Sequence, residues 1–232
     1  MISVCIATYN GEKYIKEQIS SILSQLSPRD EIIISDDGSR DNTMNILQSF
    51  NDNRIKIFFN APPHGVVPNF ENAIKHAMGN IIFLSDQDDI WMPHKVKTVL
   101  NSFQDYDFVI HNAEIVNGQK KQLGIDFFSF RHTKYGYWQN LWKMRYLGCT
   151  MAFKKEVLKD ILPFPKKILW HDMWIAAILH LKYKGLLINE PLIYYRRHGD
   201  NASPSGEKSG WSWSFRLKYR WIIFYNSILR LI

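Results

Sequence analysis

The strongest constraint on the fold is a regular alternation of short apolar runs with amphipathic segments over the first hundred residues. Apolar, β-rich runs occupy residues 2–7, 31–35, 54–59 and 80–84. Between the first two runs, residues 14–26 place their apolar side chains three to four positions apart, as on one face of a helix. Strands that alternate with helices at these lengths predict an α/β fold with a mostly parallel sheet covered by helices on both faces.

The rest of the chain continues this pattern less regularly. With 232 residues, 46% of them hydrophobic, the chain has material for one core and too little for two full domains. Residues 119–137 follow no clear period and stay unassigned, whereas Ser39 or Asp41 is expected to cap a helix that ends at Phe50. The other expected elements are helices at 69–78, 96–103, 155–161 and 171–181 and strands at 108–111, 149–153 and 186–189.

The formal net charge of +7 hides a strong asymmetry between the two halves of the chain. Residues 1–110 carry nine Lys/Arg against fourteen Asp/Glu, a balance of −5, whereas residues 111–232 carry twenty against eight, a balance of +12. A basic half suits an anionic membrane surface, a phosphate-bearing substrate or nucleic acid. Charge alone does not choose among these partners.

The cysteines and the first residues bear on the compartment. Cys5 and Cys149 are far apart and match no zinc-binding spacing, so they are expected to be buried free thiols in a reducing environment. The opening residues 1–7 have no basic leader and form only a short apolar run, which ends in polar Thr8-Tyr9-Asn10; this is typical of a strand and not of a signal peptide. The active face is therefore expected to be in the cytoplasm.

Polar and acidic segments follow three of the predicted strands. In open α/β sheets the ligand lies beyond the carboxyl ends of the strands, so these segments are expected to gather at one edge. Turn and capping roles explain Gly38 and Ser39 well, but they explain the closely spaced carboxylates poorly. The segments are Thr8-Tyr9-Asn10, Asp36-Asp37-Gly38-Ser39 and Ser85-Asp86-Gln87-Asp88-Asp89.

The acidic run after residues 81–84 predicts a divalent cation. Carboxylates from one strand-to-loop turn can converge on a hard cation, and Mg²⁺ or Mn²⁺ is commonly held by one or two carboxylates together with substrate phosphates. Without a metal these carboxylates would repel one another, and no basic residue in the adjacent sequence is expected to compensate.

Three motifs, in order and at matching distances, resemble those of family 2 glycosyltransferases. The similarity runs from the first residues to about Asn201 and implies a GT-A fold, a Rossmann-like architecture with a mostly parallel central sheet flanked by helices. It also implies an inverting, metal-dependent transfer of sugar from a nucleotide-sugar donor. The motifs are residues 3–11 (SVCIATYNG), 34–43 (ISDDGSRDNT) and 83–91 (FLSDQDDIW).

The resemblance assigns binding roles to matching positions. For Asn72 an ordinary place on a helix surface is an equally good interpretation of the sequence, and a solvated basic loop remains an alternative for residues 194–201. The implied assignments are Thr8, Tyr9, Asn10 and Glu12 along the nucleotide, Asp37 at the base, Asn69 and Asn72 near the donor, Asp86 at the donor and the metal, Asp88 and His198 as further metal ligands, and Arg196 or Arg197 at the phosphates.

The same resemblance assigns Asp172 as the general base. Many family members carry Glu-Asp at this point, and this chain resembles the subset with His-Asp. Asp172 would take the proton from the acceptor hydroxyl as its oxygen attacks the anomeric carbon from the face opposite the leaving group, which inverts the configuration. The alternative is an acid that complements the helix dipole. His171 is expected to support the base or bind the acceptor.

The tail changes in composition. From residue 211 onward it combines aromatics and arginines with no acid, and a helical projection separates two faces. Such a helix is expected to lie in a membrane interface, since its charges interrupt any spanning segment. A strand over residues 211–221, or a helix packed on protein, stays open. One face carries Ser212, Arg216, Arg220, Ser227 and Arg230, and the other Trp213, Leu217, Trp221, Phe224, Tyr225, Ile228 and Leu231.

These features predict a catalytic domain at 1–205, with a nucleotide-binding half at 1–110 and an acceptor-binding half at 111–205, and a basic amphipathic tail at 206–232. The expected enzyme is peripheral on the inner face of the cell membrane and adds a sugar to a glycan or lipid-linked oligosaccharide of bacterial O-antigen or capsule. Rhamnosyl transfer is the first expectation, with galactosyl or glucosyl transfer as alternatives.

Other classes of protein fit the sequence less well. A nucleotidyltransferase would need a Gly-rich basic loop after its first strand, where this chain has Thr8-Tyr9-Asn10. A non-catalytic sugar-nucleotide-binding module would not need the acids, and no nucleic-acid-binding signature is present in the sequence.

Overall fold

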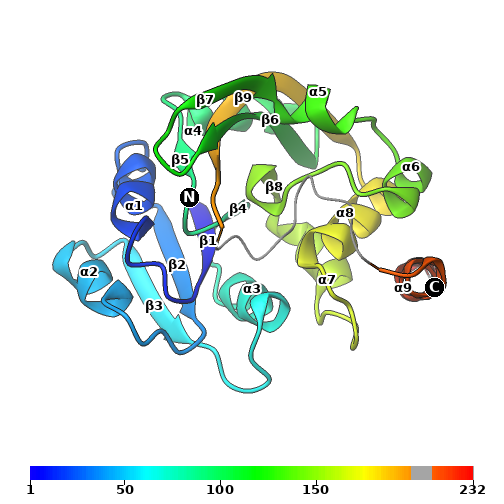
Figure 1. Ribbon diagram of the computed structural model, residues 1–232, viewed down its shortest axis with the longest axis horizontal. Helices are drawn as coiled ribbons and strands as arrows, with labels where there is room; N and C mark the ends of the chain where they lie inside the picture. Colours follow the sequence, from blue (N-terminus) through cyan, green and yellow to red (C-terminus); the bar gives the residue numbers. More distant parts are fainter. Residues whose placement is uncertain (200–210, 232) are drawn as a thin grey trace.

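A computed structural model describes residues 1–199 and 211–231. Its described strands form one nine-stranded sheet in the order β3-β2-β1-β4-β8-β6-β9-β5, with β7 paired to β6 (Figure 1). The strands are β1 (Ile2–Thr8), β2 (Glu31–Asp36), β3 (Ile55–Phe59), β4 (Ile81–Ser85), β5 (Ile90–Trp91), β6 (Phe108–Asn117), β7 (Gln122–Asp126), β8 (Met151–Lys154) and β9 (Gly185–Arg197).

The helices cover both faces of this sheet. In Figure 1, α1 and α2 lie on one side of β1, β2 and β3, and α3 lies on the other. The helices are α1 (Ile15–Leu23), α2 (Thr43–Ser49), α3 (Val66–Lys75), α4 (Lys95–Asn101), α5 (Phe127–Arg131), α6 (Tyr137–Trp142), α7 (Leu158–Ile161), α8 (His171–Lys182) and α9 (Trp213–Leu229), with 3-10 turns at Ser102–Gln104, Gly148–Thr150 and Lys155–Val157.

The first four strands form the parallel core that the sequence predicts. β1 pairs in parallel with β2 and β4, and β3 pairs in parallel with β2. Val4 lies between Ile32 and Phe83 in the register, and all three side chains are fully buried. Helices on both faces explain why the central strands β2 and β4 are continuous apolar runs, whereas β3 at the edge of the sheet carries the exposed Lys56.

The second half of the sheet differs from the sequence-based prediction in length. The strand predicted at 108–111 extends to Asn117, and the strand predicted at 186–189 extends to Arg197. These two strands pair in parallel along most of their lengths, with register shifts around Asn112. Polar residues and Pro191 interrupt their apolar pattern, so local periodicity ended both predictions too early. The unassigned stretch 119–137 contains β7, α5 and the start of α6.

Two predicted helix starts are corrected. α3 begins at Val66, three positions before the predicted Asn69, because Gly65 (φ 127°) precedes it and Pro68 fits the first turn, where no N–H is needed. The residue at the N-cap of α2 is Asn42, so neither Ser39 nor Asp41 occupies that position.

The tail forms helix α9, and the alternative of a strand is wrong. α9 packs against α6 and α8 and buries Tyr219, Ile223 and Ser227. The predicted boundary at 205/206 lies outside the described residues, as do Asp200 and Asn201 of the motif at 194–201. None of the described helices is long and apolar enough to cross a membrane. Cys5 and Cys149 are free and buried, as predicted.

Candidate active site

The loops after β1 and β4 are tied together at the carboxyl edge of the sheet. Gln87 Oε1 accepts from the backbone N–H of Tyr9 at 3.0 Å, and Gln87 Nε2 donates to the carbonyl of Tyr9 at 3.1 Å. A side chain on Gly11 would collide with the Gln87 amide. Glycine at this position therefore lets the middle residue of the acidic run reach across to the first loop.

The loops after β1 and β2 are joined in a similar way. Asn10 Oδ1 accepts from the N–H of Arg40 at 2.9 Å, and Glu12 Oε2 accepts from the N–H of Asn42 at 2.8 Å. The predicted nucleotide-lining residues Asn10 and Glu12 thus fix the shape of the second loop through its backbone. Tyr9, by contrast, leaves 53% of its surface exposed at this edge.

Two further predicted residues lie behind the loops. Thr8 is buried and donates through Oγ1 to Asp36 Oδ1 at 3.1 Å. Asn69, also buried, donates through Nδ2 to the carbonyl of Thr8 at 3.0 Å, and its Oδ1 has no partner among the described residues. Asn72 donates to Ser35 Oγ at 2.8 Å. Thr8 and Asn69 therefore support the end of β1 from inside the protein.

Asp37 connects the second loop to the segment before α3. Its Oδ1 lies 2.8 Å from His64 Nδ1 and accepts from Asn60 Nδ2 at 2.7 Å, and its Oδ2 accepts from the N–H of Gly65 at 2.7 Å. The Asp37 side chain is 10% exposed. Asp37 therefore orders the 60–65 segment at the edge where a ligand would enter.

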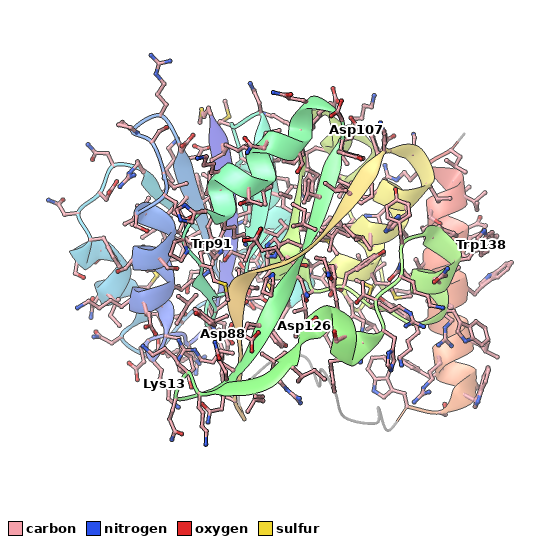
Figure 2. The ribbon with its side chains drawn as sticks, turned by 90° about the horizontal axis from the view of Figure 1, so that it is seen from above. Lys13, Asp88, Trp91, Asp107, Asp126 and Trp138 are labelled. Atoms are coloured by element: carbon pink, nitrogen blue, oxygen red, sulfur yellow. The ribbon has the colours of Figure 1, made fainter. Side chains whose placement is uncertain are left out.

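Asp88 and His198 come together from distant parts of the chain. Asp88 Oδ2 lies 2.8 Å from His198 Nε2, and the imidazole also packs at 4.6 Å, centroid to centroid, on the ring of Tyr14. Figure 2 shows Asp88 near the end of β9, the strand that His198 follows. The structure thus brings together two of the three predicted metal ligands.

Arg196 has an interior position that the sequence did not indicate. Its side chain is buried, donates from Nε to the carbonyl of Asp88 at 2.8 Å and pairs from Nη2 with Glu17 at 2.8 Å. Its backbone N–H donates to Asp89 Oδ1 at 3.0 Å. The guanidinium therefore holds the acidic loop from behind, and of the two predicted phosphate partners only Arg197 lies nearer the surface.

The third predicted ligand, Asp86, belongs to a deeper group. Ligand atoms of Asp86, Asp89 and Cys149 all lie within 4.8 Å of one another. Burial raises the pKa of Asp86 to about 7, and repulsion from Asp88 adds to the rise. Burial likewise raises the pKa of Asp89 well above its usual value, helped by Asp88 and Asp86. The acids therefore resist being charged together unless a cation is present.

One such cation comes from the protein itself, contrary to the expectation from the adjacent sequence. Lys95 on α4 is buried, donates from Nζ to the carbonyl of Cys149 at 3.2 Å and lies 4.0 Å from the ring centroid of Trp91. Burial lowers the pKa of Lys95 to about 7, while Asp89 and Asp86 act in the opposite direction. α4 contains two lysines, Lys95 and Lys97, and the sequence gave no signal that the first of them has this role.

The start of α8, with Asp172, packs against the 3-10 turn at Gly148–Thr150, which leads into the acidic group. A Cβ on Gly148 would lie 2.6 Å from His171 Nε2 and 3.4 Å from Cβ of Asp172, and the next residue is Cys149 of the acidic group. His171 is buried, stacks on Phe70 at 3.9 Å and has no hydrogen-bond partner among the described residues. A close packing of backbone and imidazole therefore sets the position of Asp172.

The electrostatic surroundings of Asp172 suit a base. Burial raises its pKa to about 6, whereas hydrogen bonds from the backbone, including the N–H of Met173 at 2.7 Å, and attraction from Arg131 oppose the rise. Asp86 lies close enough for its own pKa to be raised by Asp172. The predicted base and the acidic loop therefore share one site. Arg131, in the unassigned stretch, was not a predicted site residue.

Comparison with known proteins identifies the family. The model of Glycosyl transferase family 2 matches residues 3–162. The chain belongs to glycosyltransferase family 2. It is 31% identical over 215 residues to an uncharacterised glycosyltransferase of Nostoc, covering 86% of this chain and 66% of the relative. It thus spans somewhat less than two thirds of that relative's length.

Two characterised relatives of this family 2 glycosyltransferase carry informative names. The dTDP-rhamnosyl transferase RfbG of Shigella flexneri is 29% identical over 93% of this chain and 77% of its own. The UDP-Glc:alpha-D-GlcNAc-diphosphoundecaprenol beta-1,3-glucosyltransferase WfgD of Escherichia coli is 34% identical over 50% of this chain and 47% of its own.

Solved structures show the same GT-A fold. S. aureus TarS 1–349 in complex with UDP-GlcNAc matches 97% of this chain and 66% of its own, with a TM-score of 0.75 at 20% identity. The mannosyltransferase PcManGT of Pyrobaculum calidifontis, in complex with GDP-Man and Mn²⁺, matches 98% of this chain and 64% of its own, with a TM-score of 0.63 at 19% identity.

The residues of this glycosyltransferase fit a divalent metal. Asp88 and His198 present an oxygen and a nitrogen 2.8 Å apart, and Asp89 Oδ2 is buried without a partner among the described residues. Carboxylate donors suit Mg²⁺ or Mn²⁺, and an imidazole nitrogen among them favours a transition metal such as Mn²⁺ over Mg²⁺. The buried acids would also lose their mutual repulsion when such an ion binds.

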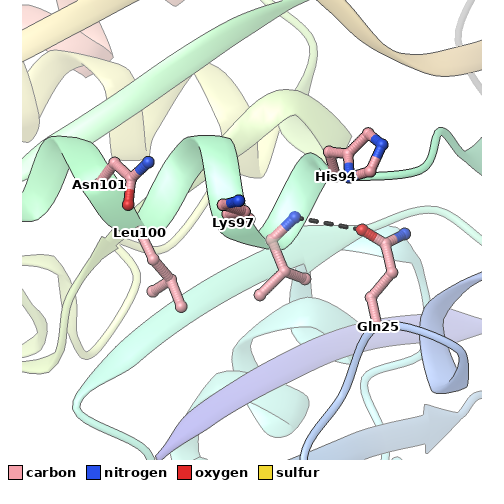
Figure 3. A pocket seen from close by; sticks show the side chains of 6 residues that line it. Gln25, His94, Lys97, Leu100 and Asn101 are labelled. Carbon is pink, nitrogen blue, oxygen red and sulfur yellow. Dashed lines mark hydrogen bonds between the residues drawn. The ribbon is translucent and has the colours of Figure 1, made fainter.

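A pocket of 410 Å³ lies on another part of this glycosyltransferase (Figure 3). Its lining comes from the loop after α1 and from the segment that contains α4, and Gln25 Oε1 accepts there from the N–H of Val96 at 3.2 Å. None of the lining residues is a predicted site residue. They are Gln25, His94, Val96, Lys97, Leu100 and Asn101.

Proposed function

We propose that this chain transfers a sugar from a nucleoside-diphosphate sugar to an acceptor hydroxyl with inversion at the anomeric carbon. The observation that carries the proposal is the close approach of Gly148 to Asp172: a Cβ on Gly148 would lie 3.4 Å from Cβ of Asp172, and the next residue is Cys149 of the acidic group. The turn at Gly148–Thr150 therefore supports a position for the Asp172 carboxylate beside the loop after β4, which is expected to hold the diphosphate.

Asp172 acts as the general base in this proposal. With a pKa raised to about 6, the carboxyl is mostly ionised at pH 7 yet more basic than an ordinary aspartate. Asp172 takes the hydroxyl proton while the acceptor oxygen forms a bond to the anomeric carbon and the bond to the diphosphate oxygen breaks. The new bond forms opposite the broken one, so the configuration inverts.

The donor and the metal occupy the edge beyond β1, β2 and β4. Asp88 and His198 would hold Mn²⁺ or Mg²⁺, with Asp86 as a further ligand from the deeper acidic group, and the ion would supply positive charge to the departing diphosphate. Arg197 is the candidate for a direct phosphate contact. Tyr9 and Asp37 face the nucleotide, whereas Thr8, Asn10, Glu12 and Asn69 act by shaping the loops around it.

The names of the relatives support a choice of donor and acceptor. Similarity to RfbG over 93% of this chain supports dTDP-rhamnose as donor, and WfgD and TarS keep UDP-glucose and other UDP-sugars as alternatives. The acceptor name of WfgD supports a lipid-linked, diphosphate-bearing glycan, as in O-antigen or capsule synthesis. Such an acceptor places the enzyme on the cytoplasmic face of the cell membrane.

A panel of nucleotide sugars tests the proposal. The correct donor should raise the melting temperature in the presence of Mn²⁺, because it binds only the native state. With an acceptor present, nucleoside diphosphate should be released, and NMR should show a product with inverted anomeric configuration. Retention of configuration would contradict the mechanism. Donor binding without turnover would favour a binding module, and pyrophosphate release would favour a nucleotidyltransferase.

A further inference from the structure

Helix α9 presents a mixed side to the protein, on which Tyr219, Ile223 and Ser227 are buried. Arg220 donates from Nε to the carbonyl of Trp142 at 2.8 Å, Arg230 from Nη2 to the carbonyl of Pro163 at 2.6 Å, and Ser227 Oγ lies 2.7 Å from the hydroxyl of Tyr137. These three residues belong to the face that the sequence marked as polar. A surface helix of a globular protein normally turns its large apolar residues inward, whereas α9 leaves several of its aromatic residues on the side away from the protein.

The aromatic side of α9 is consequently exposed. Trp213 is 64% exposed, Trp221 62% and Tyr225 53%. Helix α6 extends this surface with Trp138, 67% exposed, and Trp142, 58% exposed. We call the surface of these five residues with Leu217 the aromatic face. Contiguous exposed apolar surface of this kind marks an interaction site in a soluble protein.

Ring contacts join the two helices into one surface. The ring centroids of Trp142 and Trp213 are 6.0 Å apart, and those of Trp138 and Phe224 are 5.8 Å apart. Trp138 lies beside α9 at one end of the molecule, away from Asp88 (Figure 2), and Figure 1 places α6 and α9 together at the same end. The aromatic face is therefore separate from the proposed active site.

The charge around the aromatic face is entirely positive. Residues 127–147 and 211–231 together contain eight Lys/Arg and no Asp/Glu. Lys134, Lys143 and Lys218 are exposed. The aromatic face therefore complements a partner surface that carries negative charges on the outside and apolar material directly below them.

We propose that the aromatic face of α6 and α9 docks on an anionic lipid bilayer. Tryptophan and tyrosine concentrate at the boundary between head groups and acyl chains, and lysine and arginine are attracted to anionic head groups. α9 then lies in the plane of the membrane, with its mixed side still bonded to the protein. This surface is broader than the tail alone and involves neither the donor nor the acceptor of glycosyl transfer.

Vesicle binding tests the docking surface. The protein should float with vesicles that contain phosphatidylglycerol and much less with pure phosphatidylcholine, and added salt should weaken binding. The triple variant Trp138→Ser/Trp213→Ser/Trp221→Ser should bind at least ~10-fold more weakly. Leu123→Ser/Ile125→Ser, which removes apolar side chains that are 50% and 40% exposed on β7, should bind like the wild type.

Three outcomes would overturn the proposal. They are no binding to anionic vesicles, unchanged binding of the triple variant, or a wild-type dimer that the triple variant loses, which would assign the face to a second copy. If the triple variant fails to fold, brominated lipids provide a test on the wild-type protein, since tryptophans in the bilayer must lose fluorescence on contact with bromine. None of these outcomes bears on glycosyl transfer, which is measured with soluble donor.

Discussion

His198 Nε2 lies 2.8 Å from Asp88 Oδ2, although 110 positions separate the two residues. The contact exists because β9 runs past β5 and ends beside the loop between β4 and β5. Arg196, two residues before the histidine, holds the carbonyl of Asp88 and the carboxylate of Asp89. The end of β9 is therefore built into the acidic loop, and the imidazole reaches it in a fixed place.

Removing either partner of this contact should weaken metal-dependent donor binding. For Asp88→Asn and His198→Ala we expect donor affinity in Mn²⁺ to fall at least ~10-fold, because a ligand of the ion is lost, with little change in EDTA. Isothermal titration of the donor with and without Mn²⁺ measures this effect. His76→Ala, an exposed histidine at the end of α3, is the matched control. Equal losses with and without metal would argue against a ligand role.

Replacing the proposed base should remove turnover while leaving donor binding intact. Asp172→Asn is expected to lower kcat by a factor of ~10²–10⁴, the usual contribution of a positioned base. In the wild type, kcat/KM should fall as the pH drops below about 6, because the protonated carboxyl no longer accepts the hydroxyl proton. A variant with normal turnover would remove the assignment of Asp172.

The same substitution should stabilise the protein in mild alkali. Burial raises the pKa of Asp172, so folding carries a cost once the carboxyl ionises, absent at low pH and complete above about 6. Asp172→Asn should therefore melt a few degrees higher at pH 8 and no higher at pH 4. Asp160→Asn should do the reverse at pH 8. Burial favours a higher pKa for Asp160, but Lys182 and Tyr183 hold it below its usual value. Calorimetry at both pH values measures these differences.

Lys95→Met should impair metal binding at the acidic loop, although the lysine itself is buried behind that loop. The substitution removes the buried cation beside Asp86 and Asp89, so their pKa values should rise further and fewer carboxylates should be charged at pH 7. We expect weaker Mn²⁺ binding, because protonated carboxyls are poor metal ligands, and little loss of stability, because the lowered pKa of Lys95 shows that burial disfavours its charged form. Lys97→Met, on the exposed side of the same helix, should change neither property. Titration of Mn²⁺ and urea unfolding provide the measurements.

Gly11→Ala should displace the first loop, because the added methyl meets the amide of Gln87. We expect the KM for the donor to rise several-fold, since Tyr9 would lose its two hydrogen bonds to that amide. The double variant Gly11→Ala/Gln87→Ala relieves the collision, and Gln87→Ala alone measures the loss of the hydrogen bonds. Because all three variants lack these hydrogen bonds, their KM values should rise to a similar extent, and a Gln87→Ala variant with a normal KM would contradict this account.

The sequence alone determined the α/β architecture, because each kind of element leaves a local pattern. A strand buried on both faces requires an apolar run such as 31–35, and a helix buried on one face requires an amphipathic segment such as 14–26. The sequence also placed the acidic run Asp86–Asp89 at the ligand-binding edge of the sheet, because the run directly follows the carboxyl end of a predicted parallel strand. Residues 119–137 gave no such signal. Part of this stretch forms β7, which is ordered by pairing with β6, and neither segment has a periodicity strong enough to predict that pairing.

Only the tertiary structure decided which charged groups share a space. The family resemblance assigned Arg196 to phosphate, and nothing in the sequence singled out Lys95, yet both are buried against the acidic loop. The helical projection separated polar from aromatic residues of α9 but did not indicate that Tyr219 and Ile223 meet the protein beside Ser227. Burial and electrostatic interaction depend on distance through space and not along the chain, so these roles emerge only once the sheet has brought its strands together.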